Sequence, residues 1–193
     1  MLRLPIWEGV DEWRAEAARV ELHADGVIAT GTQIGAGYVL DYELDASASW
    51  VTRRLRVRVT TPETERAVLL EHDGEGGWLH DGAAAPALAG ALDCDLGLSP
   101  LTNLMPVRRH ALHERAGGAE IVAAWISVPD LSVHASRQRY DHVRPGVVRF
   151  TDLGLHEGFT ADLELDADGL VRLYPELARA VIPAASPARR SPS

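Results

Sequence analysis

The sequence predicts a mostly β domain, and three observations lead to that fold class. Apolar residues recur at every second position in many short segments, a pattern typical of strands with one buried face. Pairs of Gly, Asp or Pro residues separate these segments and mark turns. Segments with helical periodicity are few and short. A chain of 193 residues is long enough to form one domain of this kind with its own core.

The expected strands follow one another along almost the whole chain. The first pair, 19–24 and 27–30, surrounds the turn signal Asp25-Gly26. The other expected strands cover 38–45, 50–60, 68–72, 78–80, 121–128, 137–143, 147–151, 159–166 and 170–174. Such a series favours an antiparallel sheet. Short helices are expected at 11–18 and 176–182, and the Ala-rich segment 83–91 fits a loop as well as a helix.

We expect one β domain over residues 1–182 and a flexible tail at 183–193, because the tail is rich in Pro, Ala, Ser and Arg. The net charge of -9 would repel a phosphate backbone, so nucleic acid is not an expected partner. The chain has no run of 18 apolar residues and no apolar leader, which predicts a cytoplasmic protein without a membrane span.

One hairpin can be placed in register from the sequence. If 46–49 form its loop, Asp45 lies opposite Trp50, and Glu43 and Asp41 lie opposite Thr52 and Arg54. The same register places Arg53 beside Tyr42 on the apolar face. An unpaired guanidinium there is costly, so Arg53 either pairs with an acid or carbonyl inside or faces a wet cavity.

Residues 93–109 form the most unusual segment and alternate poorly, which predicts a shaped loop entering a strand near Val107. This segment holds two acids, two hydroxyls, an amide and two guanidinium groups, and planar polar groups of this kind suit sugar hydroxyls or a phosphate. The alternative is a long loop held by its own hydrogen bonds. The polar side chains are those of Asp93, Asp95, Ser99, Thr102, Asn103, Arg108 and Arg109.

Catalytic and metal sites have weaker support. On one strand, Asp93 and Asp95 would place their carboxyl groups roughly 5–9 Å apart, which covers the separations found in glycosidases. Cys94 between them is a poor nucleophile, because the flanking carboxylates disfavour its thiolate. The spacing of the eight His residues suggests no metal site, and no nucleotide or phosphate-binding motif is present. We therefore expect no cofactor and no metal.

Several segments in order resemble the bacterial family of putative glycolipid-binding proteins. The resemblance covers about residues 13–177, and its most specific part is the motif Ser-Pro-x-Thr-Asn-x-x-Pro-x-Arg-Arg at 99–109. His110 departs from the family, which usually has an apolar residue there. The other segments are Tyr38 and Tyr42, Trp50-x-Thr52-Arg53, Gly77-Trp78, Asp93-x-Asp95-Leu96, Gln138-x-Tyr140, Asp166-x-Asp168-Gly169-Leu170-Val171 and Tyr174-Pro175.

The resemblance implies one antiparallel sheet curled into a half-barrel around a central helix or loop, a shape similar to lipoprotein carriers. It implies no catalytic residues. Our hypothesis is that the chain binds an amphiphile such as a glycolipid, with its acyl part on the concave apolar face. The expected headgroup ligands are Arg53, Asp93, Asp95, Thr102, Asn103, Arg108, Arg109, Gln138 and Tyr140.

Two other functions stay open. The chain could be a hydrolase acting on a glycoside or ester through Asp93 and Asp95. It could also be a structural protein without a ligand, in which Asp93 or Asp95 pairs with Arg53 or Arg108. An open sheet edge makes a homodimer a further expectation.

Overall fold

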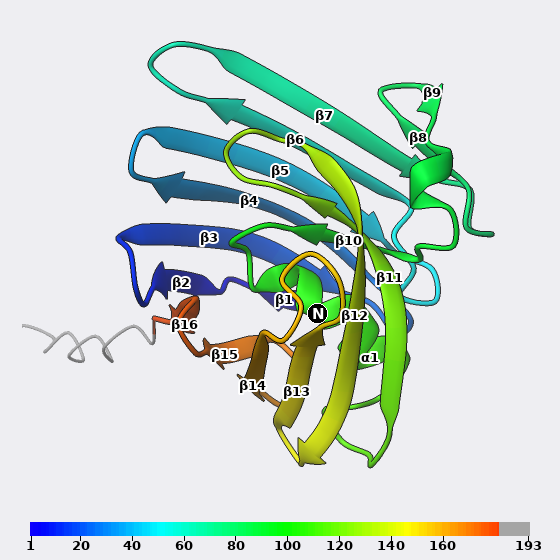
Figure 1. The fold of residues 1–193 in the computed structure, drawn as a ribbon. Helices are drawn as coiled ribbons and strands as arrows, with labels where there is room; N and C mark the ends of the chain where they lie inside the picture. Colours follow the sequence, from blue (N-terminus) through cyan, green and yellow to red (C-terminus); the bar gives the residue numbers. More distant parts are fainter. Residues whose placement is uncertain (182–193) are drawn as a thin grey trace, which may run out of the picture.

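The computed structural model describes residues 1–181 and contains one sheet of sixteen strands (Figure 1). The sheet runs in the order β10-β11-β12-β13-β14-β15-β16-β2-β3-β4-β5-β6-β7-β8-β9, and β1 pairs with β3. We call β2–β9 the N-terminal arm and β10–β16 the C-terminal arm. The strands are β1 (Leu2–Arg3), β2 (Ile6–Gly9), β3 (Arg14–Leu22), β4 (Val27–Gly35), β5 (Tyr38–Ala46), β6 (Arg54–Thr60), β7 (Glu65–His72), β8 (Trp78–His80), β9 (Ala83–Ala84), β10 (Asp93–Leu96), β11 (Gly118–Ile126), β12 (Val133–Arg144), β13 (Val147–Asp152), β14 (Thr160–Leu165), β15 (Val171–Tyr174) and β16 (Ala178–Ala180).

The N-terminal arm is a meander, and its long strands β3, β5 and β6 bury alternate residues. In β5, Leu40, Tyr42 and Leu44 are buried, whereas the acids between them face solvent. On that outer face the acids of β5 lie directly opposite the arginines of β6, which favours their pairing. The alternation therefore gives this arm one apolar inner face and one charged outer face.

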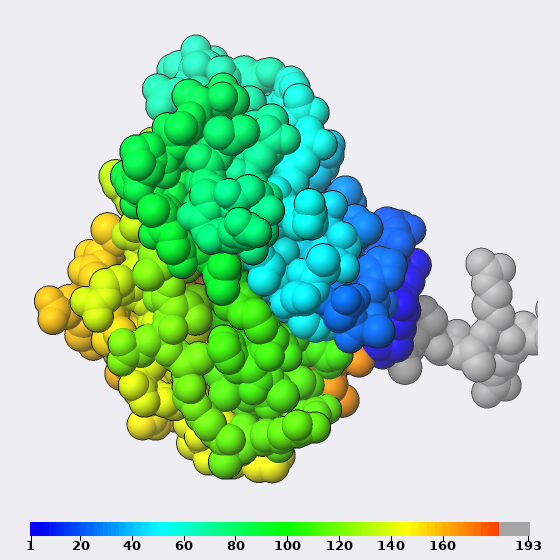
Figure 2. All heavy atoms as spheres, turned by 90° about the vertical axis from the view of Figure 1, so that its right-hand side faces the viewer, coloured from blue at the N-terminus to red at the C-terminus, as the bar shows by residue number. Residues whose placement is uncertain are grey.

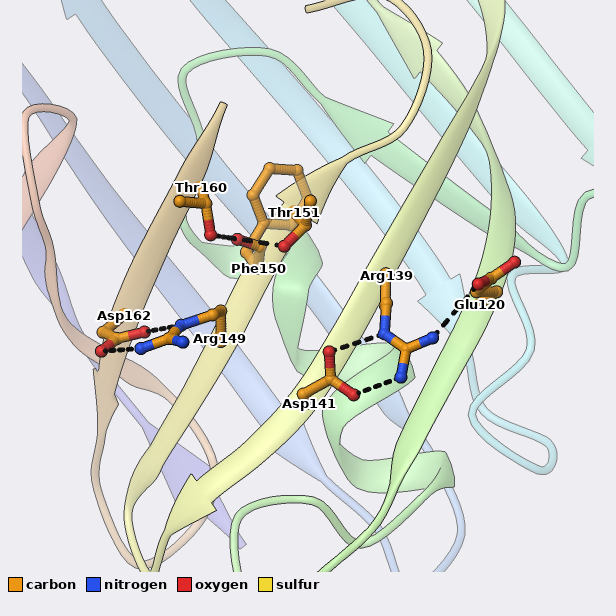
Figure 3. A network of polar contacts seen from close by, with 8 residues as sticks. All are labelled: Glu120, Arg139, Asp141, Arg149, Phe150, Thr151, Thr160 and Asp162. Atoms are coloured by element: carbon orange, nitrogen blue, oxygen red, sulfur yellow. Dashed lines mark hydrogen bonds and ion pairs between the residues drawn. The ribbon is translucent and has the colours of Figure 1, made fainter. Parts of the chain in front are cut away.

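The C-terminal arm has a polar outer face as well (Figure 3). There Arg139 on β12 contacts both Asp141 and Glu120, and Arg149 on β13 binds Asp162 on β14 through two hydrogen bonds of 2.7 and 3.0 Å. These pairs are exposed, so each adds only about 0–1 kcal/mol to stability. With charged pairs on the outer face, the inner face is the buried face of this arm.

The two arms fold over each other, and the β10–β11 edge lies inside the curl. Cys94 and Leu96 of β10 share one apolar core cluster with Leu40 of β5 and Leu70 of β7. Figure 1 shows β10 and β11 in front of β4–β6, and Figure 2 shows the residues of β7–β9, in teal and green, lying against later segments in lime. The sheet is thus rolled but not closed into a barrel.

Three short helical turns complete the fold, namely η1 (Pro86–Leu88), η2 (Leu101–Asn103) and α1 (Leu104–Arg109). Leu104 and Met105 belong to the core cluster of the N-terminal arm, whereas Val107 belongs to that of the C-terminal arm. Because α1 contributes to both clusters, it lies between the arms. No helix of residues 1–181 is long and apolar enough to cross a bilayer.

The predicted fold class is confirmed, with three corrections. The sheet is mixed, because β10 pairs with β11 in parallel. The segments 11–18 and 176–182 were predicted as helices, but β3 occupies 14–18 and β16 occupies 178–180, because sheet hydrogen bonds outweigh weak local helix propensity. Val107 lies in α1 and not in a strand. The predicted tail at 183–193 lies outside the described residues.

The predicted register of the β5–β6 hairpin is wrong by four residues. Asp45 pairs with Arg54 because residues 47–53 form a separate turn, closed by a bridge between Ala48 and Val51. A shift of four keeps the side chains of β5 and β6 on their predicted faces. Arg53, however, falls outside β6 and is exposed, so its predicted place on the apolar face is wrong.

Candidate functional site

A cavity of about 360 Å³ lies on the inner face of the C-terminal arm. Strands β10–β13 and β15, the turn after β10 and the β13–β14 connection provide its walls. This volume is at the small end of the range for ligand sites, which is roughly 300–1,000 Å³. Its lining residues are Asp95, Leu96, Gly97, Leu98, Ser99, Asn103, Trp125, Ser127, Val128, Ser136, Gln138, Phe150, Asp152, Leu155, His156, Phe159, Tyr174 and Leu177.

Strand pairing brings the polar side chains of the cavity together. Gln138 on β12 lies directly opposite Asp152 on β13, and its Nε2 donates hydrogen bonds to Asp95 Oδ2 at 2.6 Å and to Ser136 Oγ at 3.3 Å. Asp95 on β10 also accepts a hydrogen bond of 3.0 Å from the Thr102 hydroxyl. Gln138 is therefore flanked by two carboxyl groups, those of Asp95 and Asp152.

A second layer of hydrogen bonds holds the amides of this polar floor. The Tyr140 hydroxyl lies 3.0 Å from Asn103 Oδ1 and 3.1 Å from Gln138 Oε1, and its single hydrogen bonds to one of them. Asn103 Nδ2 donates to the carbonyl of Pro100 at 3.2 Å. Locked rotamers of this kind give the floor a fixed geometry before any ligand enters.

Aromatic rings form the walls of the cavity. The rings of Phe150, Phe159 and Tyr174 lie 6.1–6.4 Å from one another, and Trp125 packs edge-on against His156 at 5.9 Å. Leu155 on the β13–β14 connection is 41% exposed, so the cavity opens at this connection. The site combines a polar floor, aromatic walls and an apolar rim.

Burial changes the acidity of the groups at the site. It raises the pKa of Asp95, and the nearby charges of Asp152 and Asp93 act in the same direction, while hydrogen bonds from Gln138 and Thr102 oppose the change. Burial likewise raises the pKa of Tyr174. A buried carboxyl group with a raised pKa in a cavity is a candidate for proton exchange or hydrogen bonding with a ligand.

A second polar cluster, centred on Glu16 of β3, adjoins the cavity through Ser99. Glu16 Oε1 accepts hydrogen bonds from the Tyr42 hydroxyl at 2.7 Å and from the Ser99 hydroxyl at 2.8 Å, and Oε2 accepts a longer one, 3.3 Å, from Gln33. Burial raises the pKa of Glu16 to about 7. The Glu16 carboxyl group therefore lies behind Ser99, which lines the cavity.

The structure places the nine predicted ligand-binding residues in three groups. Asp95, Asn103 and Gln138 line the cavity, and Thr102 and Tyr140 hold them from behind. The other four lie away from it: Asp93, Arg108 and Arg109 in pairs beside the core, and Arg53 at the surface.

Asp93 and Arg109 bind each other, and neither of them lines the cavity of about 360 Å³. Two parallel hydrogen bonds of 2.7 and 2.5 Å join them, and the Asp93 side chain is 1% exposed. The expected structural pairing of Asp93 thus exists, although its partner is Arg109 and not Arg53 or Arg108. The guanidinium of Arg108 lies over the Trp50 ring at 4.8 Å and donates to the Asp168 carbonyl at 3.2 Å.

Sequence reasoning missed Asp152 and Glu16. Asp152 directly follows the predicted strand 147–151 and has the same parity as Phe150, so extending that strand by one residue would have placed it inside. Glu16 was hidden because 11–18 was interpreted as a helix. The alternation of β3 places it on the same face as Ala18 and Val20.

A groove of about 620 Å³ lies on the outer face of β3–β6, and we do not assign the function to it. Its charged residues are exposed, and one buried polar side chain, that of Tyr42, reaches it. The Tyr42 hydroxyl is bound to Glu16 on the inner side of the sheet. The outer groove therefore has no fixed polar group to orient a ligand.

Comparison with known proteins identifies the family and supports the fold. The family model described as putative glycolipid-binding matches residues 5–180. The chain belongs to this family. A crystal structure of a DUF1089 family protein from Pseudomonas aeruginosa, at 1.80 Å resolution, is 33% identical, with a TM-score of 0.70 over 93% of this chain and 89% of that one. No curated protein matches the chain.

Proposed function

We propose that the chain binds the sugar headgroup of an amphiphile in the cavity between β10 and β15. The observation that carries this proposal is the combination of fixed planar polar groups on the floor with aromatic rings on the walls. Carboxylates and amides accept and donate the hydrogen bonds of sugar hydroxyls, and aromatic rings pack against the apolar face of a sugar ring. The family description is consistent with such a ligand.

The floor also offers hydrogen-bonding capacity that the protein does not use. The Ser136 side chain is buried and accepts a hydrogen bond from Gln138, but within residues 1–181 its hydroxyl hydrogen has no acceptor. Each carboxylate oxygen of Asp95 accepts one hydrogen bond and can accept another. A ligand with several hydroxyl groups satisfies both kinds of site.

We do not place the acyl part of the ligand on the inner face of β4–β7. The inner face of β4–β7 is covered by β10, β11, η2 and α1, and its apolar residues are almost completely buried. We instead place the acyl part at the mouth of the cavity, beside Leu98, Val128 and Leu155. A chain leaving the mouth could stay in a membrane or micelle while the headgroup is bound.

Extraction of the natively purified protein tests the proposal. The protein is purified from its host without detergent and extracted with organic solvent, and the extract is analysed by mass spectrometry. We expect a glycolipid in stoichiometric amount. Trp125→Ala should lose it, whereas Trp13→Ala should retain it, because Trp13 is 71% exposed and does not line the cavity. A clean extract, or equal retention by both variants, would refute the proposal.

A hydrolase using Asp95 is the competing function, and the raised pKa of this carboxyl group favours it. The second carboxyl group would then be that of Asp152 and not that of Asp93, which is bound to Arg109. Fluorogenic glycosides distinguish the two functions. Turnover that Asp95→Asn abolishes would show an enzyme, whereas binding without turnover would support the headgroup site.

A further inference from the structure

The cavity contains the carboxyl groups of Asp95 and Asp152, and within residues 1–181 neither of them is paired with an arginine. All side-chain partners of Asp95 are uncharged, namely Thr102 and Gln138. Asp152 accepts a hydrogen bond of 2.7 Å from the Gly154 backbone and lies 3.3 Å from the exposed His156 ring. By contrast Asp93, two residues from Asp95 on the same strand, is fully paired with Arg109. The fold thus pairs Asp93 with an arginine, gives Asp95 only neutral partners, and places beside Asp152 the exposed His156 ring, which carries a charge only when it is protonated.

This arrangement is unfavourable when the cavity is empty. Asp95 and Asp152 line the same cavity, so their carboxylates repel each other when both are ionised, and this repulsion adds to the burial that raises the pKa of Asp95. Gln138, which lies opposite Asp152 in the strand pairing, donates its amide hydrogens to Asp95 and Ser136, so it has none left for Asp152. A positively charged group placed between Asp95 and Asp152 would relieve the repulsion, because its charge attracts both carboxylates.

The walls favour an organic cation over a metal ion. The face of an aromatic ring attracts ammonium groups, and Phe150, Phe159 and Tyr174 form a triangle of rings beside the carboxyl groups. Residues 1–181 contain no group of three or more His, Cys, Asp or Glu side chains that could hold a metal ion. The cavity of about 360 Å³ also provides more space than a single small cation needs.

We infer that the bound headgroup is an amino sugar whose protonated amine lies between Asp95 and Asp152, with its ring against the aromatic wall. This inference rests on the proposed sugar-binding function and adds the chemical class of the ligand. A neutral sugar can use the same hydrogen-bonding groups, but it brings no positive charge to the two carboxyl groups. An acetylated amine has no charge and needs more room at the polar floor.

Calorimetric titration of the intact protein with four probes tests the inference. The probes are glucosamine, glucose, N-acetylglucosamine and ethanolamine. We expect glucosamine to bind at least about tenfold more tightly than glucose or N-acetylglucosamine, because a charge-assisted pair in a buried site is worth about 1.4 kcal/mol or more. Ethanolamine carries the same amine without the ring and should bind more weakly than glucosamine.

Variants of the carboxyl groups provide the control. Asp152→Asn and Asp95→Asn keep the size of the side chain and should reduce the preference for glucosamine over glucose to near unity. Asp162→Asn also removes one negative charge, but from the outer face, where Asp162 is paired with Arg149 (Figure 3), and should leave the preference unchanged. Circular dichroism and thermal melts verify that each variant is folded.

The outcomes separate this inference from the proposed function. Equal binding of glucosamine and glucose would overturn the amino-sugar inference and leave the sugar site standing. Binding of ethanolamine as tight as that of glucosamine would show a simple amine site and also overturn it. If none of the probes binds, or if Ca²⁺ binds in their place, the inference is wrong, and the native extract then decides the proposed function by itself.

Discussion

Glu16 should make the folded protein less stable as the pH rises, because its carboxyl group is buried. Burial raises its pKa from 4.5 to about 7, while the hydrogen bonds from Tyr42, Ser99 and Gln33 and the charge of Arg14 oppose this change. Between these pH values the folded protein holds the proton and the unfolded chain releases it. Stability that is fully present below pH 4.5 is therefore lost as the pH rises through 7.

The size of the effect follows from the two pKa values. A change from 4.5 to about 7 is about 2.5 pKa units, and at about 1.4 kcal/mol per unit this gives roughly 3 kcal/mol over the whole window. Between about pH 5 and about pH 8 the expected loss is roughly 2–3 kcal/mol. Glu16→Gln keeps the size of the side chain and stays neutral, so the variant should not show this loss.

Urea unfolding of the wild type and of Glu16→Gln at both pH values, followed by tryptophan fluorescence, measures the effect. Comparing the two proteins at each pH cancels the titration of other groups and any fixed cost of the substitution. The variant should gain roughly 2–3 kcal/mol relative to the wild type between the lower and the higher pH. Glu43→Gln, an exposed carboxylate on β5, serves as the matched control and should show no such gain. A similar stability difference at both pH values would refute the reasoning.

Three further substitutions test the packing around the site by chemical denaturation. Asp93→Asn should destabilise the protein by about 3 kcal/mol, because it leaves the buried Arg109 without its carboxylate, and a loss below about 1 kcal/mol would contradict a structural role for this pair. Gly31→Ala should cost about 1–3 kcal/mol, since its new Cβ would lie 2.4 Å from the buried Tyr42 ring, and an unchanged midpoint would argue against this contact. Tyr140→Phe should cost about 1–2 kcal/mol and loosen the two amides that its hydroxyl contacts, and unaltered amide signals in NMR spectra would contradict that role.

Most of the sheet can be predicted from the sequence because its strands bury one face. Strands β4–β7 and β11–β15 coincide with segments of alternating polarity, and the turn signals between them are local. The failures lie where alternation is weak or the inner residues are polar. Strand β3 presents Arg14 and Glu16 to the interior, so its first half does not look like a strand with an apolar face.

The site was only partly predictable, because it depends on contacts between residues far apart in the chain. Asp95 and Gln138 are 43 residues apart, and the pairing that joins them exists only when β10 adds to β11 in parallel. The unusual composition of 93–109 indicated the right segment. Nothing in its residue types indicated that Asp93 binds Arg109 while Asp95 faces a cavity.

The position of Arg53 shows how an error of register enters a functional prediction. The hairpin argument placed its side chain on the correct parity for the inner face, but residues 47–53 leave the strand and form a turn in which Ser49 and Trp50 have positive φ angles. The backbone of Arg53 still bonds to Asp45 and His72, at 2.8 and 2.9 Å, while its side chain faces solvent. Alternation therefore fixes the face of a residue only while the ladder continues on both sides.

The contrast between Asp93 and Asp95 connects the stability of the fold with its function. Both lie on β10 and point to the same side, and burial raises the pKa of both. The guanidinium of Arg109 compensates the charge of the buried Asp93. Asp95 is instead held by neutral donors, in the same cavity as the carboxyl group of Asp152. A fold optimised only for stability would pair or remove the second charge. An acidic group with only neutral partners at the floor of an aromatic cavity fits the positively charged, hydroxyl-rich ligand that we propose.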